Sequence, residues 1–177
     1  MNDQSIIEGC KKGNPTFQKK LLEKYAGYLK VVISRYCYDA SLINDILQES
    51  WISIFQNINS YREVGKFRGW MSKIAISQCY KTFKKRNLIN YVDHIPDERT
   101  LSPKAIESLD YQDLMNVVLG LKSPEREVFL MFVIDDLNHK EIGSLLGFDE
   151  STSRVYLSKA RKQLRSQLNY LKPICSK

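Results

Sequence analysis

The residues whose chemistry is easiest to interpret lie in the last third of the chain. A short helix expected over residues 140–146 ends at the turn Gly147-Phe148-Asp149, and a longer basic helix follows at once. Two helices joined by three or four residues that include glycine form a helix-turn-helix, whose second helix enters the major groove of DNA. Residues 151–177 hold seven basic residues and no acidic one. This segment therefore predicts binding to duplex DNA.

The first turns of a groove-bound helix meet the base edges. We therefore predict base contacts from Ser151, Arg154, Val155 and Ser158. Phosphate contacts are expected from Lys159 and Lys162, with Lys140 of the preceding short helix added to the site. The competing interpretation is a solvated basic helix end that the helix macrodipole favours.

A second cationic segment covers residues 61–86, where a single acidic residue, Glu63, opposes eight basic ones. Aromatic residues are interleaved with these cations. Such a mixture suits single-stranded nucleic acid, because rings stack on unpaired bases for about 1–3 kcal/mol each while cations follow the backbone. The competing interpretation places Phe67, Trp70 and Ile74 in the core. The predicted melted-strand residues from this segment are Tyr61, Arg62, Phe67, Arg68, Trp70, Lys73, Tyr80, Lys81 and Lys84.

The bulk composition of the 177 residues limits the function classes. A net charge of +7 and a pI near 9.2 favour an anionic partner, most often nucleic acid. The four cysteines lack zinc or redox spacing, so we expect reduced thiols in the cytoplasm and neither metal nor cofactor. The longest apolar run, Val128 to Ile134, is too short to span a bilayer, which argues against direct membrane insertion.

Apolar residues recur at helical spacing and never alternate, which predicts an all-α fold. Stripes cover residues 17–36, 42–58 and 68–85. Residues 87–108 contain two prolines and a surplus of acidic side chains, as a flexible linker would. A second unit begins near residue 109, with Ser123 expected as N-cap and Pro124 as the first residue of a helix that runs to about Ile134. The prediction is two small helical domains, 1–86 and 109–177, the second containing the helix-turn-helix.

The chain resembles the extracytoplasmic-function (ECF) subfamily of bacterial sigma factors. The resemblance rests on three groups of residues in family order: Asp45-Ile46-Leu47-Gln48-Glu49; Phe67-Arg68-Gly69-Trp70-Met71 with Ile74-Ala75; and Leu121, Pro124, Arg126, Glu141-Ile142, Leu145-Leu146-Gly147, Thr152 and Ala160-Arg161. The chain departs from the family at four positions. Ser77 and Lys81 replace the usual Asn and Asp, Gly143 replaces Ala, and Ser153 replaces an aliphatic residue.

The resemblance implies a role in starting transcription. The first domain would dock on core RNA polymerase through Asp45, Gln48 and Glu49, and would capture unpaired bases of the minus-ten element, with Ser77 among the contacts. The second would read the minus-thirty-five element of promoter DNA as duplex, with Arg126 and Thr152 joining the site. The acidic linker would run near the polymerase active-site and RNA-exit channels. An anti-sigma factor would be a further partner.

Two other classes of protein are weighed against this one. A helix-turn-helix transcriptional regulator with an N-terminal sensing domain would account equally well for the C-terminal helix-turn-helix. It would not account for the basic and aromatic segment 61–86. An enzyme is disfavoured, because the sequence offers no nucleophile with a base, no metal cluster and no phosphate-binding loop.

Overall fold

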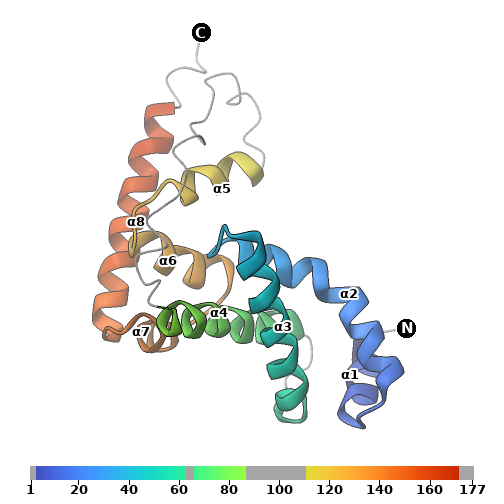
Figure 1. The fold of residues 1–177 in the computed structure, drawn as a ribbon. Helices are drawn as coiled ribbons and strands as arrows, with labels where there is room; N and C mark the ends of the chain where they lie inside the picture. Colours follow the sequence, from blue (N-terminus) through green and yellow to red (C-terminus); the bar gives the residue numbers. More distant parts are fainter. Residues whose placement is uncertain (1–2, 63–65, 87–110, 172–177) are drawn as a thin grey trace. The chain divides into compact units, whose positions relative to one another are not determined.

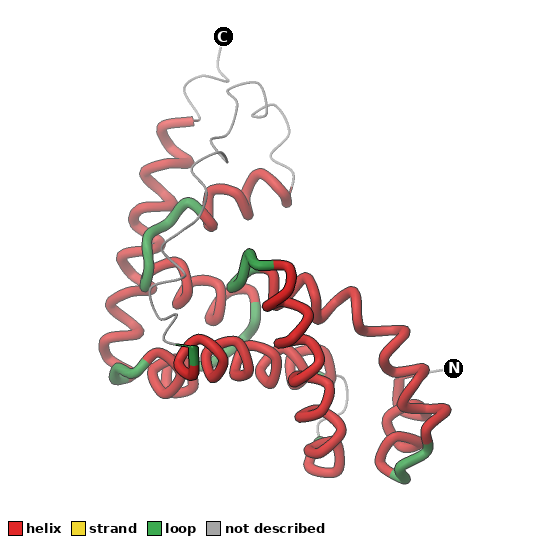
Figure 2. The backbone as a smooth tube through the Cα atoms, in the orientation of Figure 1, coloured by secondary structure: helices red, strands yellow, loops and turns green. Residues whose placement is uncertain are grey.

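The computed structural model describes residues 3–62, 66–86 and 111–171, and their regular structure is entirely helical (Figure 2). The predicted all-α class is confirmed. The chain divides into two compact units, Met1–Ile89 and Asn90–Lys177, which are described here one at a time. The predicted linker, residues 87–108, lies outside the described residues.

Within its described residues, unit 1 contains four helices and one short 3-10 turn (Figure 1). They are α1 (Asp3–Lys11), α2 (Pro15–Ser34), α3 (Ala40–Asn57), η1 (Ile58–Ser60) and α4 (Phe67–Lys85). Helix α2 packs against α1, α3 and α4, and α3 packs against α4. The side chain of Asn14 caps α2 and that of Asp39 caps α3, each accepting from a backbone amide of the first turn. These helices confirm the three predicted apolar stripes.

Helix α1 is absent from the sequence prediction. Its apolar content is one short group, Ile6, Ile7 and Cys10, all buried against the rest of the unit. The backbone at Gly9 lies so close to the ring of Phe17 that a Cβ would sit 2.2 Å from a ring carbon. Three apolar residues over one turn are too few to produce a periodic signal, so only packing against α2 shows this helix.

Unit 2 contains the helix-turn-helix (Figure 1). Its elements are α5 (Tyr111–Leu119), α6 (Glu125–Phe129), the π-helical turn η4 (Leu130–Ile134), α7 (His139–Leu146) and α8 (Glu150–Leu171). Helix α8 packs against α5, α6 and α7. The predicted cap of α6 is wrong by one position, because Pro124 is the N-cap residue and the helix begins at Glu125.

The turn between α7 and α8 depends on two glycines. Gly147 ends α7 in the left-handed region at φ 82°, where a Cβ is disfavoured. Gly143 accepts bonds from the amides of Gly147 and Phe148, and a Cβ on it would lie 2.4 Å from the carbonyl oxygen of Phe148. The departure from alanine at 143 therefore has a steric reason, since the chain returns too closely for any side chain.

His139, the first residue of α7, connects α7 to α8. It is 7% exposed, its Nδ1 lies 2.9 Å from Oγ of Ser153 in α8, and its ring stacks on Phe132 at 4.4 Å between centroids. Burial lowers the pKa of His139, nearby Arg154 and Arg161 lower it further, and Glu150 opposes them. Ser153, which stands where the family usually has an aliphatic residue, thus supplies a partner for a buried, neutral imidazole.

We expect Gly143→Ala to destabilise unit 2 by about 1–3 kcal/mol, because the new methyl group meets backbone rather than a side chain that can move aside. Gly27→Ala is the matched control. Gly27 is an exposed position inside α2 with nothing near its missing Cβ, so alanine there should stabilise unit 1 by up to about 1 kcal/mol.

Urea unfolding followed by two probes separates these effects. Both tryptophans, Trp51 and Trp70, belong to unit 1, so fluorescence follows that unit while far-ultraviolet circular dichroism follows both. Gly143→Ala should shift only the dichroism curve. A dichroism curve identical to that of the unsubstituted chain would contradict the steric account of the turn.

The neutral state of His139 predicts a pH dependence of stability. A histidine whose pKa is lowered by folding stabilises the fold above its unfolded pKa, and this contribution is lost as the pH falls. Unit 2 should therefore unfold at lower urea at pH 5.5 than at pH 7.5. His139→Gln should flatten this difference, whereas His94→Gln, which changes the other histidine, should leave it. Equal pH dependence in both variants would show that His139 is not responsible.

Candidate nucleic-acid interface

Five of the predicted melted-strand residues share one side of α4. They recur at intervals of three or four residues, which brings them to a single face of a helix. Lys81 and Lys84 are exposed, and the other three are half-buried. The opposite side is buried and includes Met71, Ala75 and Cys79. We call the first set the α4 face: Trp70, Lys73, Ser77, Lys81 and Lys84.

Tyr61, Phe67 and Trp70 form one aromatic cluster at the start of α4. Ring centroids of Tyr61 and Phe67 are 5.0 Å apart, and those of Phe67 and Trp70 are 5.5 Å apart and stacked. Tyr61 is 5% exposed and Phe67 is 4% exposed, so neither presents a ring face to a base. Their predicted role as stacking residues is wrong, because both rings are used inside the cluster. Trp70 alone of the three is partly exposed.

Three more aromatic or basic candidates, Arg68, Tyr80 and Arg62, are not part of the set named the α4 face. The guanidinium of Arg68 sits 5.5 Å from the ring centre of Tyr28 and 5.9 Å from that of Tyr25, both in α2. Burial raises the pKa of Tyr25 to about 12, helped by its bond to Asp3, so that ring is neutral and attracts the cation through its π face. Tyr80 is half-buried and packs edge-on against Tyr36. Arg62 is exposed beyond η1.

The predicted polymerase-docking residues share an exposed side of α3. Gln48 and Glu49 follow Asp45 by three and four residues, while Ile46 and Ser50 face the core. Asp45 forms an ion pair with Arg86 at 3.0 Å, joining α3 to the end of α4. Both partners are about half exposed, and such pairs contribute at most about 1 kcal/mol. Because this pair is weak, the exposed acidic side of α3 can still bind a cationic group of another molecule.

Helix α8 presents a second cationic side. The exposed residues Ser151, Arg154, Val155, Ser158 and Lys162 follow one another at helical spacing and form what we call the α8 face. Ser153, Leu157, Ala160 and Leu164 are buried on the other side. Thr152 is half-buried, and Lys159 is exposed with its ammonium 5.5 Å from the ring centre of Tyr156. These two flank the α8 face, and Lys140 is exposed at the start of α7.

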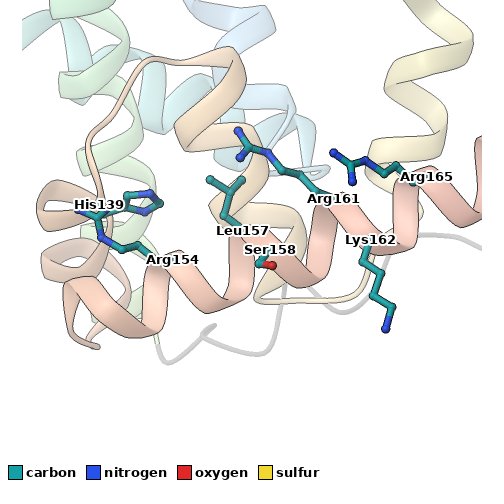
Figure 3. A pocket seen from close by; sticks show the side chains of 7 residues that line it. All are labelled: His139, Arg154, Leu157, Ser158, Arg161, Lys162 and Arg165. Carbon is teal, nitrogen blue, oxygen red and sulfur yellow. The ribbon is translucent and has the colours of Figure 1, made fainter.

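An open groove of about 600 Å³ runs along one edge of the α8 face (Figure 3). Arg161 and Arg165, which are not among the predicted DNA contacts, extend side by side from one flank of the helix, while Lys162 points from the other. Their spacing in the sequence could have predicted them, because they follow Arg154 by seven and eleven residues and so lie on the same side of the helix. Among the described residues no acidic side chain lines the groove, which is bounded by His139, Arg154, Leu157, Ser158, Arg161, Lys162 and Arg165.

Arg126 does not belong to this surface. It is 3% exposed, and its guanidinium donates to the carbonyl oxygen of Leu121 at 3.1 Å and pairs with the buried carboxylate of Glu127 at 3.1 Å. Its predicted contact with DNA is therefore wrong. The charge is already satisfied inside the unit, where it holds the connection between α5 and α6.

Two protein-family descriptions match this chain, one in each unit. Residues 21–89 match the family described as Sigma-70 region 2, and residues 111–164 match the one described as Sigma-70, region 4. The ECF RNA polymerase sigma factor SigW of Bacillus subtilis is 25% identical over 93% of this chain and 96% of its own length. The ECF RNA polymerase sigma-E factor of Haemophilus influenzae is 20% identical over 97% of both.

Two solved structures share the fold. CnrH in complex with the cytosolic domain of CnrY gives a TM-score of 0.54 at 15% identity, covering 95% of this chain and 97% of that one. The sigma factor RpoE of Bartonella quintana, in complex with the anti-sigma factor NepR, gives 0.53 at 18% identity, covering 85% and 96%. No helix among the described residues has the length and apolar character needed to cross a membrane. With both sigma-70 regions matched in order and relatives aligned over nearly its whole length, the chain belongs to the ECF subfamily of bacterial sigma factors.

Proposed function

We propose that this protein is an RNA polymerase sigma factor that directs promoter-specific initiation by binding core polymerase and promoter DNA. The observation that carries the proposal is the pair of cationic helix faces in one sigma-family chain. The α4 face includes an exposed part of Trp70 and suits an unpaired strand, whereas the α8 face lies on the second helix of a helix-turn-helix and suits duplex.

In unit 1, the α4 face would capture bases of the minus-ten element. Trp70 would stack on a base, and the buried rings of Tyr61 and Phe67 would hold its indole in place. Lys73, Lys81 and Lys84 would follow the strand's phosphates. The acidic side of α3, with Gln48 and Glu49, would dock on core polymerase.

Simple energetics explain why the polymerase is required. Stacking in duplex DNA is worth about 1.4 kcal/mol per step, so opening roughly ten steps costs on the order of 14 kcal/mol. One base stacked on Trp70 returns about 1–3 kcal/mol. The isolated chain therefore cannot keep a promoter open, and contacts made by the polymerase must supply the difference.

A one-piece transcriptional regulator with an N-terminal sensing domain is not favoured. Such a protein needs a helix-turn-helix but has no use for a face that combines lysines with a supported tryptophan. An anti-sigma factor is a proposed further partner, because both structural neighbours named above were solved with a bound protein. It would cover the surfaces that face the polymerase.

The function is tested by run-off transcription on genomic fragments with core polymerase from the source organism. Addition of the chain should produce discrete start sites that core polymerase alone does not produce, and the chain should co-elute with the core enzyme. Trp70→Ala should reduce open-complex formation while the chain still co-elutes. Failure of the unsubstituted chain to co-elute or to select a start site would refute the proposal.

The groove beside the α8 face predicts phosphate contacts from two arginines. Arg161 and Arg165 form no ion pair within residues 111–171 as described, and they repel each other one turn apart. A strand of DNA phosphates would relieve that repulsion. Arg161→Gln and Arg165→Gln should each lower the salt slope of holoenzyme binding to a promoter by about 0.9 without changing sequence preference.

The matched control for this measurement is Lys122→Gln. Lys122 is an exposed cation of unit 2 that does not line the groove, so its loss should leave the slope unchanged. The groove would lose its assigned role if both arginine variants kept the full slope.

A further inference from the structure

Val155 is an apolar residue at an exposed position, where packing of the fold does not require an apolar side chain. Its residue is 51% exposed in the middle of the α8 face, four residues after Ser151 and three before Ser158. Tyr156, the next residue of α8, packs against Phe148 of the preceding turn, with 5.3 Å between the two ring centres. The isopropyl group of Val155 therefore stands among hydroxyl and cationic side chains.

Folding gives no reason for valine at this position. An exposed helix site gains nothing from packing, and a β-branched residue loses side-chain freedom there compared with alanine or leucine. The buried side of α8 is already supplied by Leu157, Ala160 and Leu164. The surrounding cations, Arg154 and Lys162, also argue against an apolar protein surface as the partner, because such a surface would desolvate them without compensation.

The position of Val155 points instead to a base edge. It lies in the second turn of α8, within the part of a recognition helix that reaches the floor of the major groove. All the base edges there carry hydrogen-bonding groups, and thymine alone adds an apolar one, its C5 methyl. An isopropyl group set against the other edges would cover polar atoms without bonding to them.

We propose that Val155 is a specificity-determining residue that packs against the C5 methyl of a thymine in the duplex promoter element. This inference rests on the proposed function and adds to it one base of the recognised sequence. Ser151 and Ser158 would lie on either side of the same base along the helix. Arg154, exposed and paired with Glu150, would meet a neighbouring position.

The test is a double-substitution cycle on the complete holoenzyme. Each thymine of the minus-thirty-five element, on either strand, is replaced by deoxyuridine, which removes only the methyl group. Binding is measured at one salt concentration for the unsubstituted holoenzyme and for Val155→Ala. Val31→Ala is the matched control, because Val31 is also an exposed helical valine but belongs to α2 of unit 1.

The expected result is a coupling confined to one or two neighbouring thymines. There, deoxyuridine should weaken binding by the unsubstituted holoenzyme and by Val31→Ala by about fourfold, the value of one buried methyl group. Val155→Ala should bind thymine and deoxyuridine promoters equally. Because the cycle compares the same two DNAs with each protein, any change in DNA shape cancels.

Two results would overturn the inference: deoxyuridine has no effect on the unsubstituted holoenzyme at any position, or it weakens Val155→Ala by the same factor. Should Val155→Ala bind too weakly to measure, Val155→Thr keeps one branch methyl in a side chain of the same shape. It should retain a part of the thymine preference, and full retention or complete absence would count against the contact. If the unsubstituted holoenzyme selects no start site, the proposed function itself fails, whereas start-site selection without coupling removes only the role of Val155.

Discussion

Burial of one side of α4 and one side of α8 is the constraint on which both candidate interfaces depend. A fully buried apolar side chain is worth about 1.5–3 kcal/mol, whereas a like-charged pair one helical turn apart costs about 0.2–0.5 kcal/mol. Residues such as Met71 and Ile76 in α4, or Leu157 and Leu164 in α8, therefore outweigh the repulsion among the cations opposite them. Each helix can therefore keep a predominantly positive face exposed to solvent.

Arginine has different roles at two places in unit 2, one buried and one exposed. The guanidinium of Arg126 is closed off by carbonyl oxygens and by Glu127, so it stabilises the connection between two helices. Those of Arg161 and Arg165 border an open groove whose described lining residues include no acidic side chain. What distinguishes them is the surrounding structure, since an arginine enclosed by acceptors has no free donors for an external anion.

Two departures from the family pattern are each explained by a close contact within the helix-turn-helix. Gly143 makes room for the carbonyl of Phe148, and Ser153 provides the hydroxyl that His139 needs to be buried without charge. The first contact joins α7 to the turn and the second joins α7 to α8, so both help to fix the position of α8 relative to α7. The departures at Ser77 and Lys81 differ in kind, because they lie on the α4 face, the surface proposed to bind an unpaired strand.

The sequence by itself determined the helical class, the three long stripes of unit 1, the helix-turn-helix and the faces of α4 and α8. These follow from local periodicity, in which residues three and four apart share a side whatever the helix packs against. Only the tertiary structure determined which of the predicted site residues are exposed and which are buried. It buried Tyr61, Phe67 and Arg126, turned Arg68 toward α2 and revealed α1. The physical reason is that burial depends on partners distant in sequence, such as Tyr28 for Arg68 or Ser153 for His139, and periodicity along one helix carries no information about them.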